Sequence, residues 1–188
     1  MLYHLKEYNS YAEITGYKNI KFAMAEGFLK ANRKENQANV DLQFFDASLI
    51  ATQEHLYFAA LNAFQAFQNK TNISKSIAME TMLYASAQRQ IQKAIERCGV
   101  KPETRSMGVI IIGEDPTQLK IMLQVISTYV GVEPDEKVLE ISNFKEHKII
   151  EAFQITDQEL KTVIKNENRT EAVVNLVIER VALLATQL

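Results

Sequence analysis

Ser106-Met107-Gly108-Val109-Ile110-Ile111-Ile112 is an apolar segment near the middle of the 188-residue chain. A short run of this kind, rich in β-branched residues, is typical of a strand that is covered on both faces of its sheet. Asp115-Pro116 follows directly and predicts a helix to about Val130, because Asp is a preferred helix cap and Pro is tolerated at the first helical position. A buried strand that leads into a helix predicts an α/β fold.

The segments on either side predict more strands and one prominent loop. Alternating apolar residues around Asn9-Ser10 predict a hairpin of two short strands, and the polar stretch Asn32 to Asn39 predicts a loop. The expected strands, besides the central one, cover residues 3–8, 11–15, 40–45 and 138–141.

Helical periodicity and cap signals predict the remaining elements. Gly99 marks the end of one helix, and the pairs Thr156/Glu159 and Asn168/Glu171 have the spacing of a capping box. The expected helices cover residues 20–30, 52–68, 76–85, 88–98, 115–130 and 144–153, a short helix after Thr156, and a last helix from Asn168 to Thr186. We therefore expect one mixed α/β domain over residues 1–188, with a small, mainly antiparallel sheet packed with several helices.

Composition excludes several classes of protein. Apolar residues make up 47% of the chain, charged residues 23%, and the formal net charge is −2, so the chain is neither disordered nor built to hold nucleic acid over its whole surface. No signal peptide and no apolar run of about 18 residues is present, which predicts a cytoplasmic protein with no membrane contact. The lone Cys98 excludes an intrachain disulfide.

Patterns of catalytic or metal-binding residues are absent. The chain has no G-x-S-x-G segment, and the glycines at 108 and 113 precede Glu114-Asp115, which would repel a phosphate. Cys98 lies at a predicted helix C-terminus, where the dipole disfavours a thiolate. The spacing of the three histidines fits no metal motif, and His55 is interpreted as satisfied by nearby backbone. We therefore expect no enzyme activity, no metal and no cofactor.

Two helices are apolar on more than one face. Apolar side chains surround the helix at 76–85 and cover more than one stripe of the last helix. Burial in the core alone and burial combined with a partner surface both fit this pattern. The residues concerned include Ile77, Met79, Leu83, Val177, Val181 and Leu184.

A row of cations follows the first of these helices. Arg89, Lys93 and Arg97 recur every four residues, and Lys101 lies just beyond them. Residues 86–105 hold five Lys and Arg against two Glu, whereas residues 106–160 hold ten Asp and Glu against four Lys. The row fits either a phosphate-binding patch or an ordinary solvated face.

Three stretches resemble the family of small proteins that bind the atypical kinase of the KEOPS complex (TPRKB-like), and most closely its archaeal members. They are residues 45–51 (FDASLIA) leading into Glu54-His55-Leu56, residues 80–86 (ETMLYAS) with Arg89-Gln90-Ile91, Ala94-Ile95 and Gly99, and Ile155-Thr156 with Glu159-Leu160. The middle stretch is the most specific, and the resemblance covers roughly residues 40 to 160.

The resemblance implies a non-catalytic subunit of the complex that makes threonylcarbamoyladenosine in tRNA. Such a subunit binds and stimulates the small kinase, meets the other KEOPS subunits through it, and helps recruit tRNA by its 3′ CCA end. The two unexplained features suit these roles. Ile77, Met79, Leu83, Val177, Val181 and Leu184 become candidate kinase contacts, and Arg89, Lys93, Arg97 and Lys101 become candidate tRNA contacts.

Two other hypotheses belong to different classes. A free-standing single-stranded RNA-binding module would use the cation row as its main site and bury the apolar helices in its core. A small hydrolase or transferase would need a pocket with convergent titrating groups, for which the sequence offers no positive sign.

Overall fold

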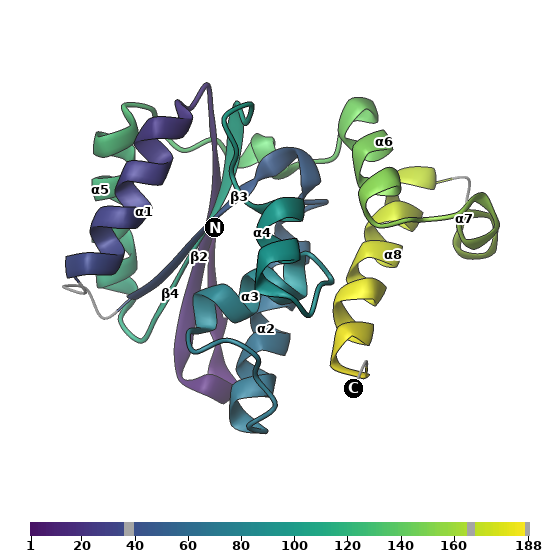
Figure 1. Cartoon of the computed structure of the whole chain (residues 1–188), viewed down its shortest axis with the longest axis horizontal. Helices are drawn as coiled ribbons and strands as arrows, with labels where there is room; N and C mark the ends of the chain where they lie inside the picture. The colour runs from purple at the N-terminus through teal and green to yellow at the C-terminus, as the bar shows by residue number, and fades with distance from the viewer. Residues whose placement is uncertain (36–39, 165–167, 187–188) are drawn as a thin grey trace.

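The computed structural model describes residues 1–35, 40–164 and 168–186, in which four strands form one antiparallel sheet of order β1-β2-β4-β3 (Figure 1). The strands are β1 Leu2–Leu5, β2 Ser10–Lys18, β3 Val40–Asp46 and β4 Ser106–Gly113. The apolar segment at 106–112 is β4, which pairs with β2 on one side and β3 on the other. The expected mixed α/β fold is confirmed.

Successive side chains of β4 enter two different cores. Val109 and Ile111 pack with the helices α1 (Phe22–Glu35) and α5 (Pro116–Val130), whereas Ile110 and Ile112 belong to the core on the opposite face. This alternation follows from the pleat of a strand, which directs neighbouring residues to opposite faces. Both cores thus depend on one strand, which explains why nearly every residue of β4 is apolar.

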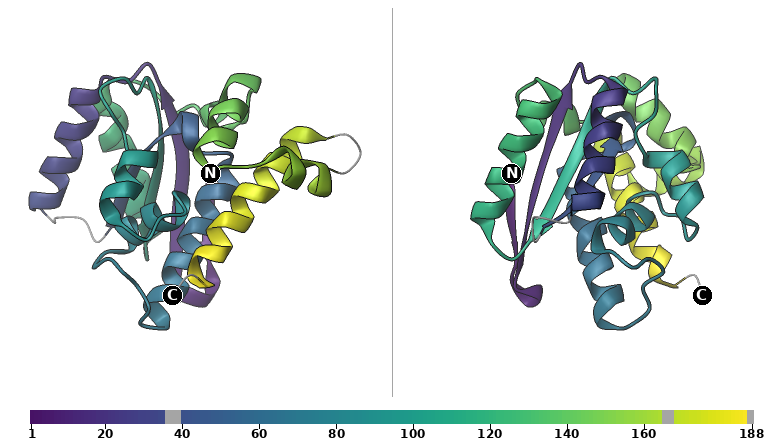
Figure 2. Two further views of the ribbon diagram at one scale, coloured as in Figure 1. Left: turned by 45° about the vertical axis from the view of Figure 1, so that its right-hand side comes forward. Right: turned by 60° about the vertical axis from the view of Figure 1, so that its left-hand side comes forward.

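Six helices build the second core. Figure 1 shows α2, α3 and α4 on the side of the sheet opposite α1 and α5, with α6 to α8 outside them. Figure 2 shows α2 and α8 running side by side, and the two helices are in contact. The helices are α2 Gln53–Gln68, α3 Ile77–Ala85, α4 Ile91–Cys98, α6 Asn143–Ala152, α7 Asp157–Val163 and α8 Arg169–Leu183.

Local cap signals place several helix starts where they are expected. The Thr156 side chain accepts a hydrogen bond from the Glu159 backbone N–H while the Glu159 carboxylate accepts one from the Thr156 backbone, so the predicted capping box is present. Asp115 caps α5, and Gly131 ends it with a positive φ of 72°. Among the described residues, every helix is too short or too polar to cross a lipid bilayer.

Several predicted boundaries differ from the structure. The N-terminal hairpin is present, but β1 ends at Leu5 and a 3-10 turn, Lys6–Tyr8, leads to Asn9 in the left-handed conformation. Helix α1 continues to Glu35 through the first half of the predicted loop, and residues 36–39 lie outside the described residues. Helix α4 begins only at Ile91, three residues later than predicted.

The strand predicted at residues 138–141 is wrong. The structure has a 3-10 helix, Glu136–Leu139 (η3), in which Val138 and Leu139 are buried. The Asp135 backbone N–H donates to the Gly16 carbonyl at 2.7 Å, and a Cβ at Gly16 would lie 2.7 Å from that of Val138. Because β2 is already paired on both sides, η3 packs across its face instead of adding a strand to the sheet.

Candidate functional site

A surface groove of about 590 Å³ lies beside α4 and α6. Three of the four predicted tRNA contacts, Lys93, Arg97 and Lys101, line it together. We call it the cationic groove. Its lining residues are Leu49, Gln88, Lys93, Glu96, Arg97, Lys101, Lys148, Glu151 and Ala152.

Helix α4 presents its cations to the groove because it is amphipathic. Ala94 and Cys98 are its buried residues and face the core, while Lys93 is exposed and Arg97 is half-buried. Lys93 and Arg97 are four residues apart, so they lie one above the other on the same face. The short buried side chains let α4 approach the core closely, and its long cations remain at the surface.

Arg97 also has a structural role. Its Nη1 donates a hydrogen bond to the Ser86 carbonyl at 2.9 Å, which lies just after α3, and its guanidinium lies 5.7 Å from the centre of the Phe153 ring. These contacts tie α4 to the end of α3 and to the segment after α6. The guanidinium is therefore held in place, as a preorganised phosphate contact would be.

The fourth predicted cation, Arg89, lies apart from the others. It is exposed in the turn before α4, and it is not among the lining residues of the cationic groove. The four-residue spacing that joined Arg89 to the row assumes a helix that begins at residue 88. Helix α4 begins at Ile91, so Arg89 precedes the helix and does not share the helical face of Lys93 and Arg97.

Lys148 is the groove cation that sequence reasoning missed. It belongs to α6, fifty residues from α4, and only the packing of the chain brings it to the groove. Glu96 and Glu151 also line the groove, so four cations face two carboxylates. The local charge is positive in a chain whose net charge is −2, and an anionic ligand is the complementary partner.

Four of the six predicted kinase contacts lie inside the protein. Leu83, Val177 and Val181 are inaccessible, and Leu184 is 3% exposed. All four belong to the core that α2 and α3 share with α8. In this conformation they offer no surface to a partner, and the apolar faces of α3 and α8 are explained by burial within the chain.

The other two predicted contacts, Ile77 and Met79, are half-buried. Ile77 lines a cleft of about 1000 Å³, together with two aromatic residues of α2, Phe64 and Phe67. We call it the α2–α3 cleft. Its polar lining residues are Ser10, Asp41, Lys75, Ser76, Glu114, Asp115 and Gln118.

His55 is held by backbone groups, as the sequence interpretation proposed. Its Nδ1 accepts a hydrogen bond from the Ala51 N–H at 3.1 Å, and its Nε2 lies 2.8 Å from the Ala85 carbonyl, to which it donates. The ring is fully buried, and this burial lowers the pKa of His55 to about 4. The neutral imidazole links the start of α2 to the end of α3.

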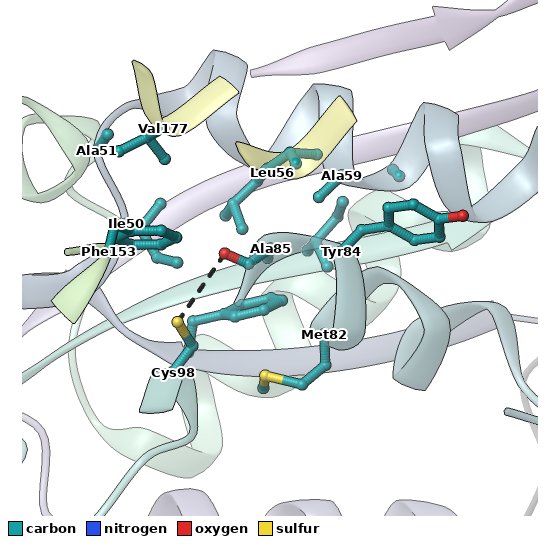
Figure 3. Close-up of a cluster of buried hydrophobic side chains, with 14 of the residues drawn as sticks. Ile50, Ala51, Leu56, Ala59, Met82, Tyr84, Ala85, Cys98, Phe153 and Val177 are labelled. Carbon is teal, nitrogen blue, oxygen red and sulfur yellow. Dashed lines mark hydrogen bonds between the residues drawn. The ribbon is translucent and has the colours of Figure 1, made fainter. Parts of the chain in front are cut away.

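Cys98 is a packing residue of the same region. Figure 3 shows it near Met82, Ala85 and Phe153. Its Sγ lies 4.0 Å from the Ala85 carbonyl oxygen. Burial raises the pKa of the thiol to about 12, so it is not a nucleophile at neutral pH. Within residues 1–35, 40–164 and 168–186, no group of three or more His, Cys, Asp or Glu has an arrangement that could hold a metal ion.

Comparisons with known proteins agree with the resemblance noted in the sequence. Residues 14–185 match the model of a family described as kinase binding protein CGI-121. The regulatory protein Cgi121 of Methanocaldococcus jannaschii is 33% identical over 126 residues, which are 67% of this chain and 79% of that protein. The match begins in β2 and ends within the last turn after α8.

Proposed function

This chain belongs to the CGI-121 family of kinase-binding proteins, and from this membership we propose that it is the non-catalytic, regulatory subunit of a KEOPS complex. In this role it binds the small atypical kinase of the complex, stimulates it, and meets the other subunits through it. The observation that carries the proposal is the family match over residues 14–185, which includes most of the sheet and every α-helix.

We place the kinase contact at the α2–α3 cleft. Ile77 and Met79 are the two predicted contacts that keep accessible surface, and Ile77 forms an apolar wall with Phe64 and Phe67. Interfaces concentrate their binding energy in apolar and aromatic anchors that fill such pockets. A standard interface buries about 1,600 Å² in total, so the contact extends beyond the cleft onto neighbouring surface.

The cationic groove supports the second role, recruitment of tRNA through its single-stranded 3′ CCA end. Lys93, Arg97, Lys101 and Lys148 provide positive charge for the phosphates. Arg89 is exposed but is not among the lining residues of the groove, so in this proposal it contacts only a part of the RNA that extends beyond the groove.

The experiment that tests the proposal is co-elution with the small KEOPS kinase of the same organism in size-exclusion chromatography. We expect one species at micromolar concentrations, and a faster ATP turnover of the kinase in the complex. Ile77→Arg places a charge in the α2–α3 cleft and is expected to separate the two proteins, whereas Ile121→Arg, the same substitution at an exposed site of α5, is the control.

Separate elution of the unmodified proteins would reject the adaptor role. The cationic groove would then favour the alternative function, a free-standing single-stranded RNA-binding module. That alternative predicts salt-dependent RNA binding without the kinase, because each phosphate contact to a single strand contributes about −0.7 to the log–log slope.

A further inference from the structure

A third cavity, of about 410 Å³, lies next to the cationic groove at the N-terminal end of α6, and we propose that it binds a nucleotide unit, with the base on Phe144 and the phosphate among the surrounding cations. Of the tRNA contacts proposed above, only Lys148 also lines this pocket. The volume lies in the range of small-ligand sites. We call it the α6 pocket.

Phe144 provides the surface for the base. It is 71% exposed, more than any other large apolar side chain of the described residues, and it is the second residue of α6. Lys148, one turn later, holds its ammonium 4.8 Å from the centre of the ring. One face of the ring thus already carries a cation. A base stacks on an exposed aromatic face irrespective of its identity, and a phosphate beside it would meet Lys148.

The charges around the pocket favour an anion. Five cations and three carboxylates line it: Lys18, Arg105, Lys137, Lys145 and Lys148 against Asp46, Glu103 and Glu140. Lys18 is paired with Asp135, so four other cations face three carboxylates and the lining keeps a net charge of +1. Hydroxyl groups of Ser48 and Thr104 donate hydrogen bonds to the Asp46 carboxylate. The N-terminal end of α6 adds the positive end of a helix dipole.

Lys145 gives the pocket a buried cation that is held in a fixed position, which a merely basic surface lacks. Its side chain is buried, with the residue 5% exposed, and its Nζ donates to the Val138 and Glu140 carbonyls at 3.1 and 3.2 Å. Among the described residues, no carboxylate lies within 4 Å of this ammonium, and a third N–H has no acceptor there. Burial lowers the pKa of Lys145 to about 8, so the group still carries a charge at neutral pH.

Two sources of this ligand chemistry fit the pocket: one nucleotide of an RNA strand, or a free mononucleotide. Lys148 lines both the α6 pocket and the cationic groove, so a strand in the groove can continue onto Phe144. The RNA source rests on the proposed tRNA contact, whereas the free nucleotide does not.

The test compares two probes on the intact chain: adenosine 5′-monophosphate, followed by isothermal titration calorimetry, and a fluorescein-labelled single-stranded RNA decamer ending in CCA, followed by anisotropy. Phe144→Ala should weaken binding by roughly 5- to 100-fold, because stacking on the ring is lost. Phe144→Tyr keeps the ring and should bind as the unmodified chain does. Ile121→Ala, at an apolar site of α5 that is 47% exposed, is the control for loss of an exposed apolar side chain.

Each outcome decides the proposal. A loss of affinity in Phe144→Ala for either probe, with Phe144→Tyr unaffected, supports the pocket, and the probe affected identifies the source. Equal affinities of Phe144→Ala and the unmodified chain, or no binding of either probe by the unmodified chain, overturn it. Lys93→Gln separates the two proposals: if it alone weakens RNA binding, the tRNA contact stands and the α6 pocket fails.

Discussion

Helices α3 and α4 follow each other in the chain, and the sequence suggests an interaction surface for both, yet α4 presents most of its residues at the surface, whereas α3 keeps only Ile77 and Met79 partly accessible. Seven of the nine residues of α3 are buried, including Glu80, whose carboxylate accepts hydrogen bonds from the Ile73 and Ser74 backbone N–H groups. Only Ala94 and Cys98 of α4 are buried. An amphipathic pattern identifies a surface, whereas an all-round apolar pattern only shows that a helix is covered.

The largest effect is expected from a charge in α3. Leu83→Arg places an unpaired cation in the core, which should lower the free energy of unfolding by several kcal/mol, on the order of 4 or more, before any docking is affected. Ile91→Arg, at an exposed site of α4, should stay within about 0.5 kcal/mol. Urea unfolding followed by circular dichroism measures both. A folded Leu83→Arg chain of normal stability that fails to bind the kinase would place Leu83 at the interface. This result would contradict the contrast between a covered α3 and an exposed α4.

The second largest effect is expected from His55, which links α2 to the end of the buried helix α3. Its pKa is about 4 in the native state and about 6.5 in the unfolded chain, so the unfolded state binds more protons between these values. The contribution of His55 to the free energy of unfolding is complete above pH 6.5 and is lost as the pH falls toward 4. We expect the free energy of unfolding to drop by about 2 kcal/mol between pH 7 and pH 5.

His55→Gln provides the control for this pH dependence. The variant is less stable at pH 7 but should lose less stability than the unmodified chain on acidification, since glutamine does not titrate. Urea titrations at pH 7, 6 and 5 give the two slopes. Parallel slopes would show that His55 is not the titrating group and would weaken its role as the link to α3.

The fold was predictable where its signals are local. β4 is recognised from its unbroken apolar run, and α5 and α7 from the caps Asp115 and Thr156, because these patterns depend on residues a few positions apart. The 3-10 helix η3 was not, because its position depends on Gly16, more than a hundred residues earlier. In its sequence pattern, an apolar segment that packs across the face of a sheet resembles a strand within that sheet.

The candidate site was predictable in part for the same reason. Lys93 and Arg97 come from one helix and were identified from their spacing. Lys148 reaches the cationic groove from α6, and no spacing in the sequence relates it to α4. The apolar pattern around Leu83 and Val177 predicted that these side chains are covered, but it does not distinguish a covering surface of the chain itself from that of a partner.

Arg97 should give a smaller effect on stability than His55, because it is half-buried and its contacts are neutral acceptors and a ring. Arg97→Met removes the hydrogen bond to Ser86 and the contact with Phe153, and is expected to cost about 1 kcal/mol. Arg97→Lys keeps the charge but not the planar group, so the free energy of RNA binding should fall by less than the free energy of unfolding. Thermal unfolding and RNA anisotropy, measured on the same samples, separate the two roles. An unchanged melting temperature in Arg97→Met would make Arg97 a free surface cation.

Lys93 should give the smallest effect on stability and the cleanest effect on binding, since it is exposed and no ion pair or hydrogen bond of its side chain is present among the described residues. Lys93→Gln should leave the free energy of unfolding within about 0.5 kcal/mol. In the proposed RNA complex it removes one phosphate contact, which should reduce the log–log salt slope by about 0.7 in magnitude. Anisotropy titrations between 50 and 200 mM KCl, at roughly four salt concentrations, would measure this slope. An unchanged slope together with unchanged stability would make the exposed face of α4 an ordinary solvated surface, and α3 and α4 would then differ only in how the chain covers them.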